Sequence, residues 1–378
     1  MIPFSRRFHW DQTPNRLTQA LAARRAAGAP VLDLTESNPT RAGLVYGPEI
    51  AQAFDDPRML VYDPAPRGAM EAREAVARYY AMRGHNVPVD RILLTASTSE
   101  AYSYLFKLLC DPGDEVLVPR PSYPLFEYLA EMESVKVRQY SLHYHGGWSM
   151  DVPELTDRTR AVVLVNPNNP TGSFVKRAEL AALAERCAEQ GVALISDEVF
   201  ADYAFGEDRE RVSTLAAVEG CAAFCMSGLS KVAGLPQMKL GWIVTNNAAA
   251  IEKLEWIADT YLSVSTPVQY AAARLLAAGD AVQRQIRART AANLAMAREL
   301  LHGSGGNILA VEGGWYITVQ VPRVRTEEEW TLQLLESHGV LVQPGFFYDF
   351  ENEAFLVVSL LTPPEIFGEG LQRIRIWL

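Results

Sequence analysis

The sequence predicts an α/β protein in which a mostly parallel sheet is covered by helices on both faces. Short, continuously apolar segments rich in β-branched residues recur between residues 91 and 244. They alternate with segments whose apolar residues recur at helical spacing. Strands that are apolar throughout belong to sheets buried on both faces. The alternation of strands with helices therefore indicates a doubly wound sheet.

The elements of this sheet can be assigned in chain order. The predicted strands are 91–95, 114–119, 161–166, 192–196, 222–227 and 240–244. The predicted helices between them are 99–109 and 177–190. Together these elements make a large domain, which we expect to span residues 46–282.

The pattern changes after the sheet. Residues 280–302 are expected to form one long helix, and alternating strands and a final helical pattern follow it. This mixture is typical of a smaller α+β domain. We expect residues 283–378 to form that domain together with residues 1–45, which pack beside it.

Composition and charge exclude several classes of protein. The chain has 378 residues, of which 49% are hydrophobic and 21% charged, as in globular proteins. A net charge of -10 argues against nucleic acid or an anionic membrane surface as a partner. The four cysteines lack the spacing of a zinc site or a disulfide framework. With no leader and no apolar run of membrane length, we expect a cytoplasmic protein without a metal site.

Polar residues follow the predicted strands, where ligands bind in sheets of this kind. After the first strand, "ASTSE" places Thr98 and Ser99 at the start of a helix. These hydroxyls suit a phosphate, although a helix cap completed by Glu100 explains them equally well. After the second strand, Tyr123 stands between two prolines. It could stack on a planar ring or simply pack as a large apolar side chain.

The later strands are followed by residues whose side chains offer an amide, a carboxylate and an amine. "PNNPTG" offers the amide of Asn169, although a plain turn would have the same composition. Asp197 ends an apolar strand, where a carboxylate is costly to bury without a cation. Lys231 lies in a loop between two apolar strands. A lysine there is usually a solvated charge, but a desolvated one can lose its proton and attack a carbonyl.

These side chains together describe a single ligand. A hydroxylated helix start suits a phosphate, an aromatic side chain suits a planar ring, a carboxylate suits a ring nitrogen, and an amine suits an aldehyde. Pyridoxal 5'-phosphate combines all four features. The sequence therefore predicts this cofactor.

Three motifs occur in a familiar order: "NPNNPTG", "SDEVF" and "SGLSKVAGLPQMKLGW". With them the chain resembles the class I/II aminotransferases, which are pyridoxal-phosphate enzymes of fold type I. The resemblance runs from "LDLTESNPT" (32–40) to "FLVVSLL" (355–361). It implies a seven-stranded type of sheet, a smaller domain, and transfer of an amino group from a donor to a 2-oxo acid in two half-reactions.

The resemblance also implies a role for each site residue. Lys231 would form the Schiff base and then carry the proton, and Asp197 would pair with the pyridine nitrogen. Asn169 would bond the phenolic oxygen, and Tyr123 would stack on the ring. The phosphate would be held by Thr98, Ser99, and Ser227 or Ser230, with Tyr62 of "YDPAPRG" reaching the phosphate of a neighbouring subunit. That last role implies a homodimer with shared active sites.

Three positions depart from the family pattern. Lys239 replaces an arginine, which keeps a cation for the phosphate but loses the bidentate fork. Phe200 replaces a tyrosine, so one hydroxyl beside the phenolic oxygen is missing. Val357, or Val358 if the register slips by one, stands where an arginine usually binds the substrate carboxylate.

The third departure leaves the substrate open. The chain must bind a carboxylate by other means or accept an amine without one. Arg16 and Arg41 are candidate replacements, and Glu36 could receive a cationic substrate group. A lyase or decarboxylase on the same fold is an alternative to the aminotransferase. A non-catalytic sensor is disfavoured, because the pattern begins too early for a preceding DNA-binding module.

Overall fold

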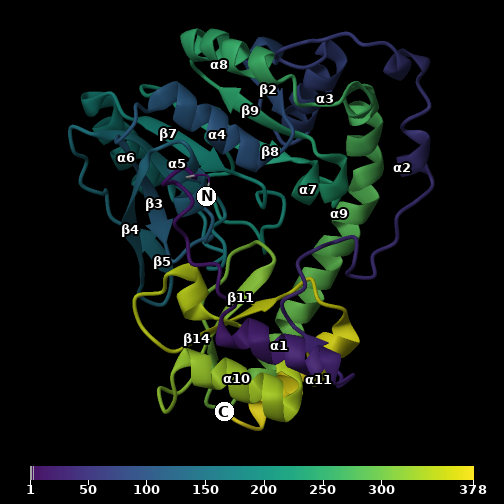
Figure 1. The fold of residues 1–378 in the computed structure, drawn as a ribbon, viewed down its shortest axis with the longest axis vertical. Coiled ribbons are helices and arrows are strands. Elements are labelled where there is room, and N and C mark those ends of the chain that lie inside the picture. Colours follow the sequence, from purple (N-terminus) through teal and green to yellow (C-terminus); the bar gives the residue numbers. More distant parts are fainter. Residues whose placement is uncertain (1, 3) are drawn as a thin grey trace.

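The computed structural model describes Ile2 and residues 4–378. An eight-stranded sheet with helices on both faces occupies the upper part of Figure 1. Smaller sheets lie below it, surrounded by helices from both ends of the chain. Helix α9 (Thr266–Leu301) runs between the two parts. The α/β fold class predicted from the sequence is confirmed.

The large sheet has the strand order β2-β9-β8-β7-β6-β3-β4-β5. Its strands are β2 (Ile92–Thr95), β3 (Glu115–Arg120), β4 (Lys136–Tyr144), β5 (Trp148–Met150), β6 (Thr159–Val165), β7 (Ala193–Asp197), β8 (Ala223–Gly228) and β9 (Gly241–Thr245). Pairing is parallel from β4 through β3, β6 and β7 to β8. Strand β9 runs antiparallel to β2 and β8. The carboxyl ends of the parallel strands therefore meet along one edge of the sheet.

The six predicted strands are found within two residues of their expected bounds. The sequence did not reveal β4 and β5. Strand β5 pairs with β4 alone and forms the edge of the sheet. In β4 only Tyr140 is buried, and the other residues are partly buried or exposed. An edge strand needs no continuous apolar run, so the signal used for the other strands is absent. The short edge strand β5 brings the sheet from seven strands to eight.

Helices cover both faces of the large sheet. Helices α4 (Thr98–Leu109), α5 (Phe126–Met132) and α8 (Ala248–Tyr261) pack on one face. Helices α3 (Met70–Ala81), α6 (Arg177–Gln190), α7 (Leu229–Val232) and α9 pack on the other. Successive strand residues point to opposite faces. Neighbouring side chains at the end of one strand therefore lie among different helices.

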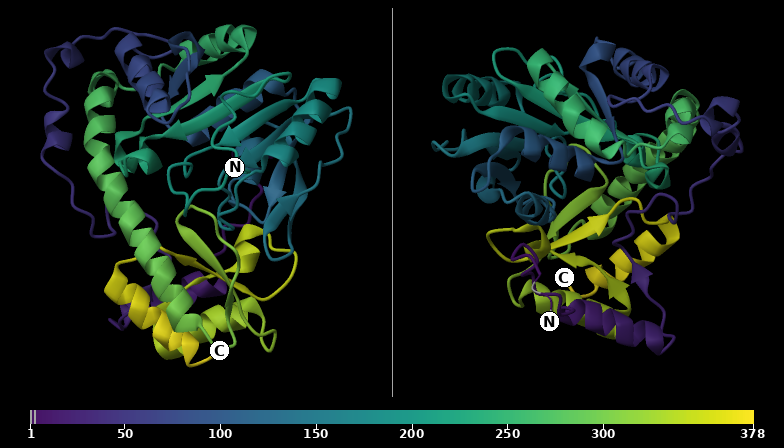
Figure 2. Two further views of the ribbon diagram at one scale, coloured as in Figure 1. Left: turned by 180° about the vertical axis from the view of Figure 1, so that it is seen from behind. Right: turned by 45° about the horizontal axis from the view of Figure 1, so that its top comes forward.

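The lower part joins both ends of the chain. Its sheets are β10-β11-β14-β13 and β1-β12, built from β1 (Leu32–Asp33), β10 (Asn307–Ile308), β11 (Tyr316–Gln320), β12 (Val340–Leu341), β13 (Gln343–Pro344) and β14 (Phe355–Ser359). Around them lie α1 (Arg16–Ala26), α10 (Glu327–His338) and α11 (Pro364–Arg375). Leu34 belongs to a buried core whose other members lie between Leu294 and Ile374 in the sequence. The N-terminal segment thus packs against the C-terminal one (Figure 2).

The remaining elements are single turns: α2 (Glu49–Gln52) and the 3-10 helices η1 (Pro57–Leu60), η2 (Val89–Arg91), η3 (Pro236–Met238) and η4 (Gly345–Tyr348). No helix of the described residues is both long and apolar enough to cross a membrane.

Helix α9 corrects one prediction. It begins at Thr266 rather than at Asp280, and the expected boundary at 282/283 falls inside it. Within α9, a Cβ added to Gly279 would overlap the Cβ of Ala233 at the end of α7. A glycine at this position lets the two helices approach closely. Helix α9 thereby holds in place the short helix that carries Lys231.

Candidate active site

The carboxyl edge of the large sheet gathers the predicted site residues from separate strands. Asp197 ends β7, and Lys231 lies on α7 directly after β8. Asn169 follows β6, and Tyr123 follows β3. Thr98 begins α4 after β2. Residues that are far apart in the sequence share this edge because their strands run in the same direction within one sheet.

Asp197 is buried and held by two hydrogen bonds. Its Oδ2 accepts from the Tyr102 hydroxyl at 3.2 Å, and its Oδ1 accepts from the Val199 N–H at 3.2 Å. Burial raises the pKa of Asp197 to about 6, although both hydrogen bonds and the charge of Lys231 oppose the rise. A carboxylate fixed in this way is suited to a cationic partner such as a protonated ring nitrogen.

Lys231 is surrounded by aromatic rings. Its Nζ lies 4.7 Å from the ring centroid of Trp315 and 5.5 Å from that of Phe200. Burial lowers its pKa to about 8, while the charge of Asp197 acts in the opposite direction. The Tyr203 hydroxyl donates to the Lys231 carbonyl and fixes the backbone of α7. The site therefore holds an amine that is partly neutral near physiological pH.

The two adjacent asparagines after β6 have different surroundings. Asn168 holds its loop, because its Nδ2 donates to the Pro121 carbonyl and to Thr171 Oγ1, both at 2.9 Å. The Oδ1 of Asn169 is buried without a hydrogen-bond partner in the described chain. Buried polar atoms are nearly always paired. Asn169 thus has a free amide oxygen at the place where a ligand is expected.

Tyr123 borders the same space. Its side chain is 39% exposed. Burial, followed by the negative charges of Asp197 and Tyr316, raises its pKa to about 12. The charge of Asp197 thus acts on Tyr123, and the stacking role that the family resemblance implies stays a prediction.

At the start of α4, capping and anion binding use different residues. Ser97 is the N-cap and accepts from the Glu100 N–H at 3.2 Å. Glu100 in turn accepts from the Ala96 N–H at 2.6 Å. The hydroxyls of Thr98 and Ser99 make no hydrogen bond within the described residues, and Ser99 is exposed. They remain available to a phosphate, so the capping and phosphate interpretations are compatible.

The other residues predicted to bind the phosphate lie in different surroundings. Ser230 precedes Lys231 on α7 and is partly buried. The side chain of Ser227 instead lines a cavity on the α3 and α9 side of the sheet, with Tyr80. Lys239 is exposed with a left-handed backbone at φ 50°, and Tyr62 is 77% exposed. Neither of these two side chains contributes a hydrogen bond or ion pair within the described residues.

The register of β14 decides between Val357 and Val358. Val357 lies opposite Thr318 on β11 and Gln343 on β13, so these three side chains share one face. Val357 belongs to the core cluster that contains Phe200, Trp315 and Tyr316, the aromatic surroundings of Lys231. Val358 faces the separate core of the lower part. The residue on the active-site face is thus Val357, which is 1% exposed.

The candidate charged replacements occupy different positions. Arg16 forms an ion pair with Glu328 at 2.8 Å, and Arg41 is exposed. Glu36 accepts from the Asn38 N–H at 2.8 Å. Burial raises the pKa of Tyr316, a hydrogen bond from the Ser37 hydroxyl opposes the rise, and the charge of Glu36 adds to it. The charge of Glu36 thus acts on Tyr316, whereas neither arginine forms an ion pair or a side-chain hydrogen bond with Tyr316, Asp197 or Lys231 within the described residues.

Several site residues were missed by the sequence reasoning: Tyr102, Tyr203, Trp315, Tyr316 and Thr318. None stands directly at the carboxyl end of a strand of the large sheet. They come from the surrounding helices, a loop and the small sheet, and tertiary packing brings them to Lys231 and Asp197. Three of them, Trp315, Tyr316 and Thr318, lie in "GGWYITV", where the two adjacent aromatic residues are the local signal that could have found them.

Comparison with known proteins decides the family. The model of the family "Aminotransferase class I and II" matches residues 29–374. The chain belongs to this family. It is 26% identical to bovine tyrosine aminotransferase over 371 residues, which cover 91% of the chain and 81% of that protein. The glutamate-pyruvate aminotransferase AlaA of Escherichia coli is 30% identical over 215 residues, covering 54% of the chain and 53% of AlaA.

Solved structures agree on the fold. Alanine aminotransferase from Pyrococcus furiosus superposes with a TM-score of 0.88 at 23% identity, with 99% of each chain covered. A mutant of Thermus thermophilus aspartate aminotransferase gives 0.85 at 24% identity over the full length of both chains. The protein is a pyridoxal-phosphate-dependent aminotransferase. The site fits the cofactor, because Asn169 has an unpaired buried oxygen and a buried carboxylate accompanies the lysine.

We expect uptake of pyridoxal phosphate by the cofactor-free enzyme to accelerate as pH rises and to level off above about 8. Only the neutral amine attacks an aldehyde, and burial lowers the pKa of Lys231 from 10.5 to about 8. Stopped-flow absorbance measures the rate, with N-α-acetyl-lysine as the unperturbed control. A rate that follows the control up to pH 10 would contradict the lowered pKa.

Proposed function

We propose that Lys231 is the residue that holds the cofactor and carries the proton during amino transfer. When bound, pyridoxal phosphate supplies an aldehyde that condenses with an amine and a ring that withdraws electrons. The buried amine of Lys231, with its lowered pKa and with Asp197 nearby, is the observation that carries the proposal. A lysine with a pKa near 8 can both accept and return a proton near neutral pH.

The other side chains of the site position the cofactor. We assign the ring nitrogen to Asp197, the phenolic oxygen to Asn169 and the ring face to Tyr123. Phe200 packs edge-on against Trp315, with ring centroids 5.2 Å apart, and so supports the wall of the pocket. As a phenylalanine it supplies no hydroxyl to the cofactor. This leaves Asn169 as the polar contact for the phenolic oxygen.

The phosphate is assigned to the start of α4. Thr98 and Ser99 supply hydroxyls, and the N-terminus of a twelve-residue helix favours an anion. Ser230 is the better placed of the two serines near the lysine, because Ser227 lines a cavity on the other side of the sheet. Lys239 is exposed and can reach the phosphate through solvent as a point charge.

A labelling experiment tests this proposal. Borohydride reduction of the holoenzyme should fix the cofactor on Lys231, and mass spectrometry of its peptides should locate it there. K231A should lose the visible absorbance band and at least about 1,000-fold in the rate of amino transfer, since it removes both the anchor and the proton carrier. K253A, which changes an exposed lysine of α8, is the matched control. A label on another residue would overturn the assignment.

We further propose that the amino donor presents a neutral group toward the small sheet. The face of that sheet toward Lys231 carries Val357, Thr318 and Gln343, and none of these is charged. Burial of a carboxylate against Val357 without a cation would cost several kcal/mol. Thr318 Oγ1 is buried without a partner in the described chain and can bond a neutral amide or hydroxyl. A primary amine, amino alcohol or amino amide fits this face.

The names of the relatives favour a second candidate. Tyrosine, glutamate and pyruvate in those names point to ordinary amino acids and 2-oxo acids. In that case a cation from elsewhere must bind the α-carboxylate. Arg41, on the loop after Glu36, is the nearest candidate in the sequence. A lyase or decarboxylase on the same site is distinguished by release of ammonia or carbon dioxide in place of a 2-oxo acid.

Donor preference separates the two candidates. Phenylalaninol and phenylalanine amide should convert the cofactor to its amino form with kcat/KM at least about 10-fold above that of phenylalanine, equivalent to about 1.4 kcal/mol. V357R should reverse this order, because it supplies a bidentate partner for the carboxylate. V358R places the charge in the opposite core and should only destabilise the fold. A wild-type preference for the free amino acid would exclude the neutral-group proposal.

We also propose a homodimer in which Tyr62 reaches the partner's active site. Leu60, Val61 and Tyr62 are 82%, 62% and 77% exposed. Three consecutive apolar side chains in solvent indicate a surface that another chain covers. Tyr62 borders Leu262 and Ser263, between α8 and α9. A second copy of the chain is the partner that the family resemblance implies.

Sedimentation velocity should show a dimer for the holoenzyme. Replacing Tyr62 by Phe should leave the dimer intact and weaken cofactor affinity about 10-fold, since only the hydroxyl that reaches the phosphate is lost. Y128F removes a hydroxyl from another surface-exposed tyrosine and serves as the control. A monomer that retains its cofactor with full activity would refute the shared site.

The division into residues 46–282 and residues 1–45 with 283–378 is likewise a proposal. The lower part has a core cluster of its own, which supports the division, while another cluster runs from the large sheet to Trp315, Tyr316 and Val357 and joins the two parts. Helix α9 crosses the proposed boundary without a break, so any movement between the parts must bend this helix or pivot on it. The cytoplasmic location expected from the sequence stays a prediction.

A further inference from the structure

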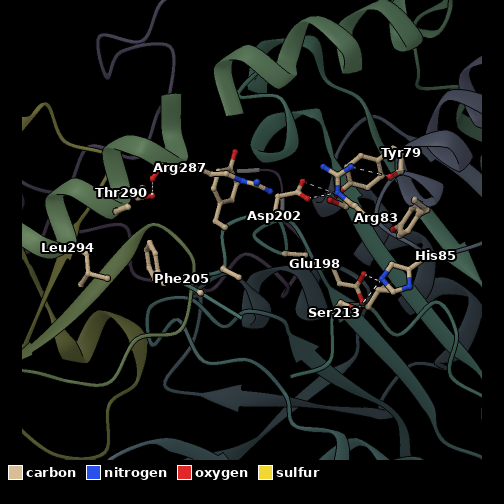
Figure 3. Close-up of a pocket in the computed structure, with 18 of the residues that line it drawn as sticks. Tyr79, Arg83, His85, Glu198, Asp202, Phe205, Ser213, Arg287, Thr290 and Leu294 are labelled. Carbon is tan, nitrogen blue, oxygen red and sulfur yellow. Dashed lines mark hydrogen bonds and ion pairs between the residues drawn. The ribbon is translucent and has the colours of Figure 1, made fainter. Parts of the chain in front are cut away.

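A cavity of about 770 Å³ opens between α3, the loop after β7, and α9 (Figure 3). Its volume is typical of sites for small organic ligands. Tyr79 and Arg83 come from the α3 region, Phe205 from the loop, and Arg287 and Leu294 from α9. Lys231, Asp197, Asn169 and Tyr123 all lie outside its lining.

The cavity is separate from the cofactor site. Asp197 contacts Tyr102 of α4, on one face of the sheet. The next residue, Glu198, accepts from Thr214 Oγ1 at 2.7 Å and lines the cavity on the opposite side. Neither Lys231 nor Asp197 belongs to the lining of the cavity. A molecule bound here would therefore not occupy the place of an amino substrate.

Two arginines of α9 lie at the cavity without a carboxylate partner. Arg287 and Arg298 are exposed, and neither forms an ion pair or a side-chain hydrogen bond within residues 2 and 4–378. Eleven residues bring the helix almost back to the same side after about 16 Å. Both guanidinium groups are therefore available to an anion at this wall.

The third arginine of the cavity is already occupied. Arg83 forms an ion pair with Asp202 and lies 3.6 Å over the ring of Tyr79. Asp202 also accepts from the Tyr79 hydroxyl at 3.0 Å and from Gln283 at 2.9 Å. This network neutralises the carboxylate, so it does not cancel the charges of Arg287 and Arg298.

The wall between the two free arginines is apolar. Ala291, Leu294 and Ala295 lie on the cavity side of α9, and Phe205 adds a ring from the loop. This surface suits an alkyl or aryl group and offers few hydrogen bonds to one. The combination of apolar wall and unpaired guanidinium groups fits a molecule with an apolar body and an anionic end.

The lining of the cavity includes one buried polar atom without a partner in the described chain. Ser227 is 1% exposed, and its Oγ has no hydrogen-bond partner in the described chain. Burial raises the pKa of the neighbouring Glu198 to about 7, although Thr214 and Leu215 donate to it. A buried hydroxyl without a partner is rare. It marks a place where a bound molecule or water completes the hydrogen bonding.

We propose that this cavity is a second ligand site, which takes a small carboxylate with an alkyl or aryl body. The carboxylate pairs with Arg287 or Arg298, the body lies along Leu294 and Phe205, and the Ser227 hydroxyl faces the inner end of the ligand. Glu198 directly follows β7 and Ser227 lies on β8, and Asp197 and Lys231 lie at the ends of the same two strands. The ligand therefore contacts these two strands from the face opposite the cofactor.

Calorimetric titration of the holoenzyme with 4-phenylbutyrate tests the proposal. Binding should be measurable, and 4-phenylbutanamide, which lacks the charge, should bind at least about 10-fold more weakly. The double variant R287A/R298A should weaken binding of the carboxylate about 10-fold or more, and the single variants show which arginine receives it. R284A is the matched control, because Arg284 is also exposed on α9 but pairs with Asp280 and lies outside the lining.

Steric filling gives an independent test. A291W should block the cavity and abolish binding, whereas A288W, at an exposed alanine of α9 outside the lining, should not. Binding should persist in enzyme whose cofactor has been fixed by borohydride. Loss of binding in that enzyme would place the ligand in the active site and overturn the proposal. Equal binding of the amide, or no effect of R287A/R298A and A291W, would overturn it as well.

Discussion

Burial of opposite charges at one edge of the sheet is the constraint on which the rest of the structure depends. Lys231 and Asp197 lie at the ends of neighbouring strands, and burial disfavours the charged form of each. Each charge partly offsets the cost of burying the other, and Tyr102 and Val199 stabilise the carboxylate further. The result is an amine that can be neutral near physiological pH beside a carboxylate that can still ionise.

This pair needs a rigid frame, and the surrounding elements provide it. Lys231 lies on a four-residue helix, which has little stability of its own. Tyr203 bonds its backbone, and α9 packs closely on α7 because Gly279 has no side chain there. The same α9 continues into the lower part of the molecule. The lysine is thus positioned by the helix that joins the two parts.

The small sheet determines what lies opposite the lysine. Strand alternation sends Val357 toward Trp315 and Tyr316, and sends Val358 into the lower core. Charge on the active-site face is therefore set by single residues of β11, β13 and β14. With Val357, Thr318 and Gln343 on this face, the described chain supplies neutral groups where a carboxylate would need a cation.

The sequence by itself determined the fold class, the strands buried on both faces, and the family, because continuous apolar runs and three ordered motifs are local signals. It also placed Lys231, Asp197, Asn169 and Tyr123 at strand ends. It missed β4 and β5, since an edge hairpin need not be apolar, and it began α9 too late. Only the tertiary structure decided the register at Val357, the side of the sheet on which Ser227 lies, and the aromatic surroundings of Lys231. Each of these features depends on how segments that are distant in the sequence pack against one another. The local sequence does not contain that information.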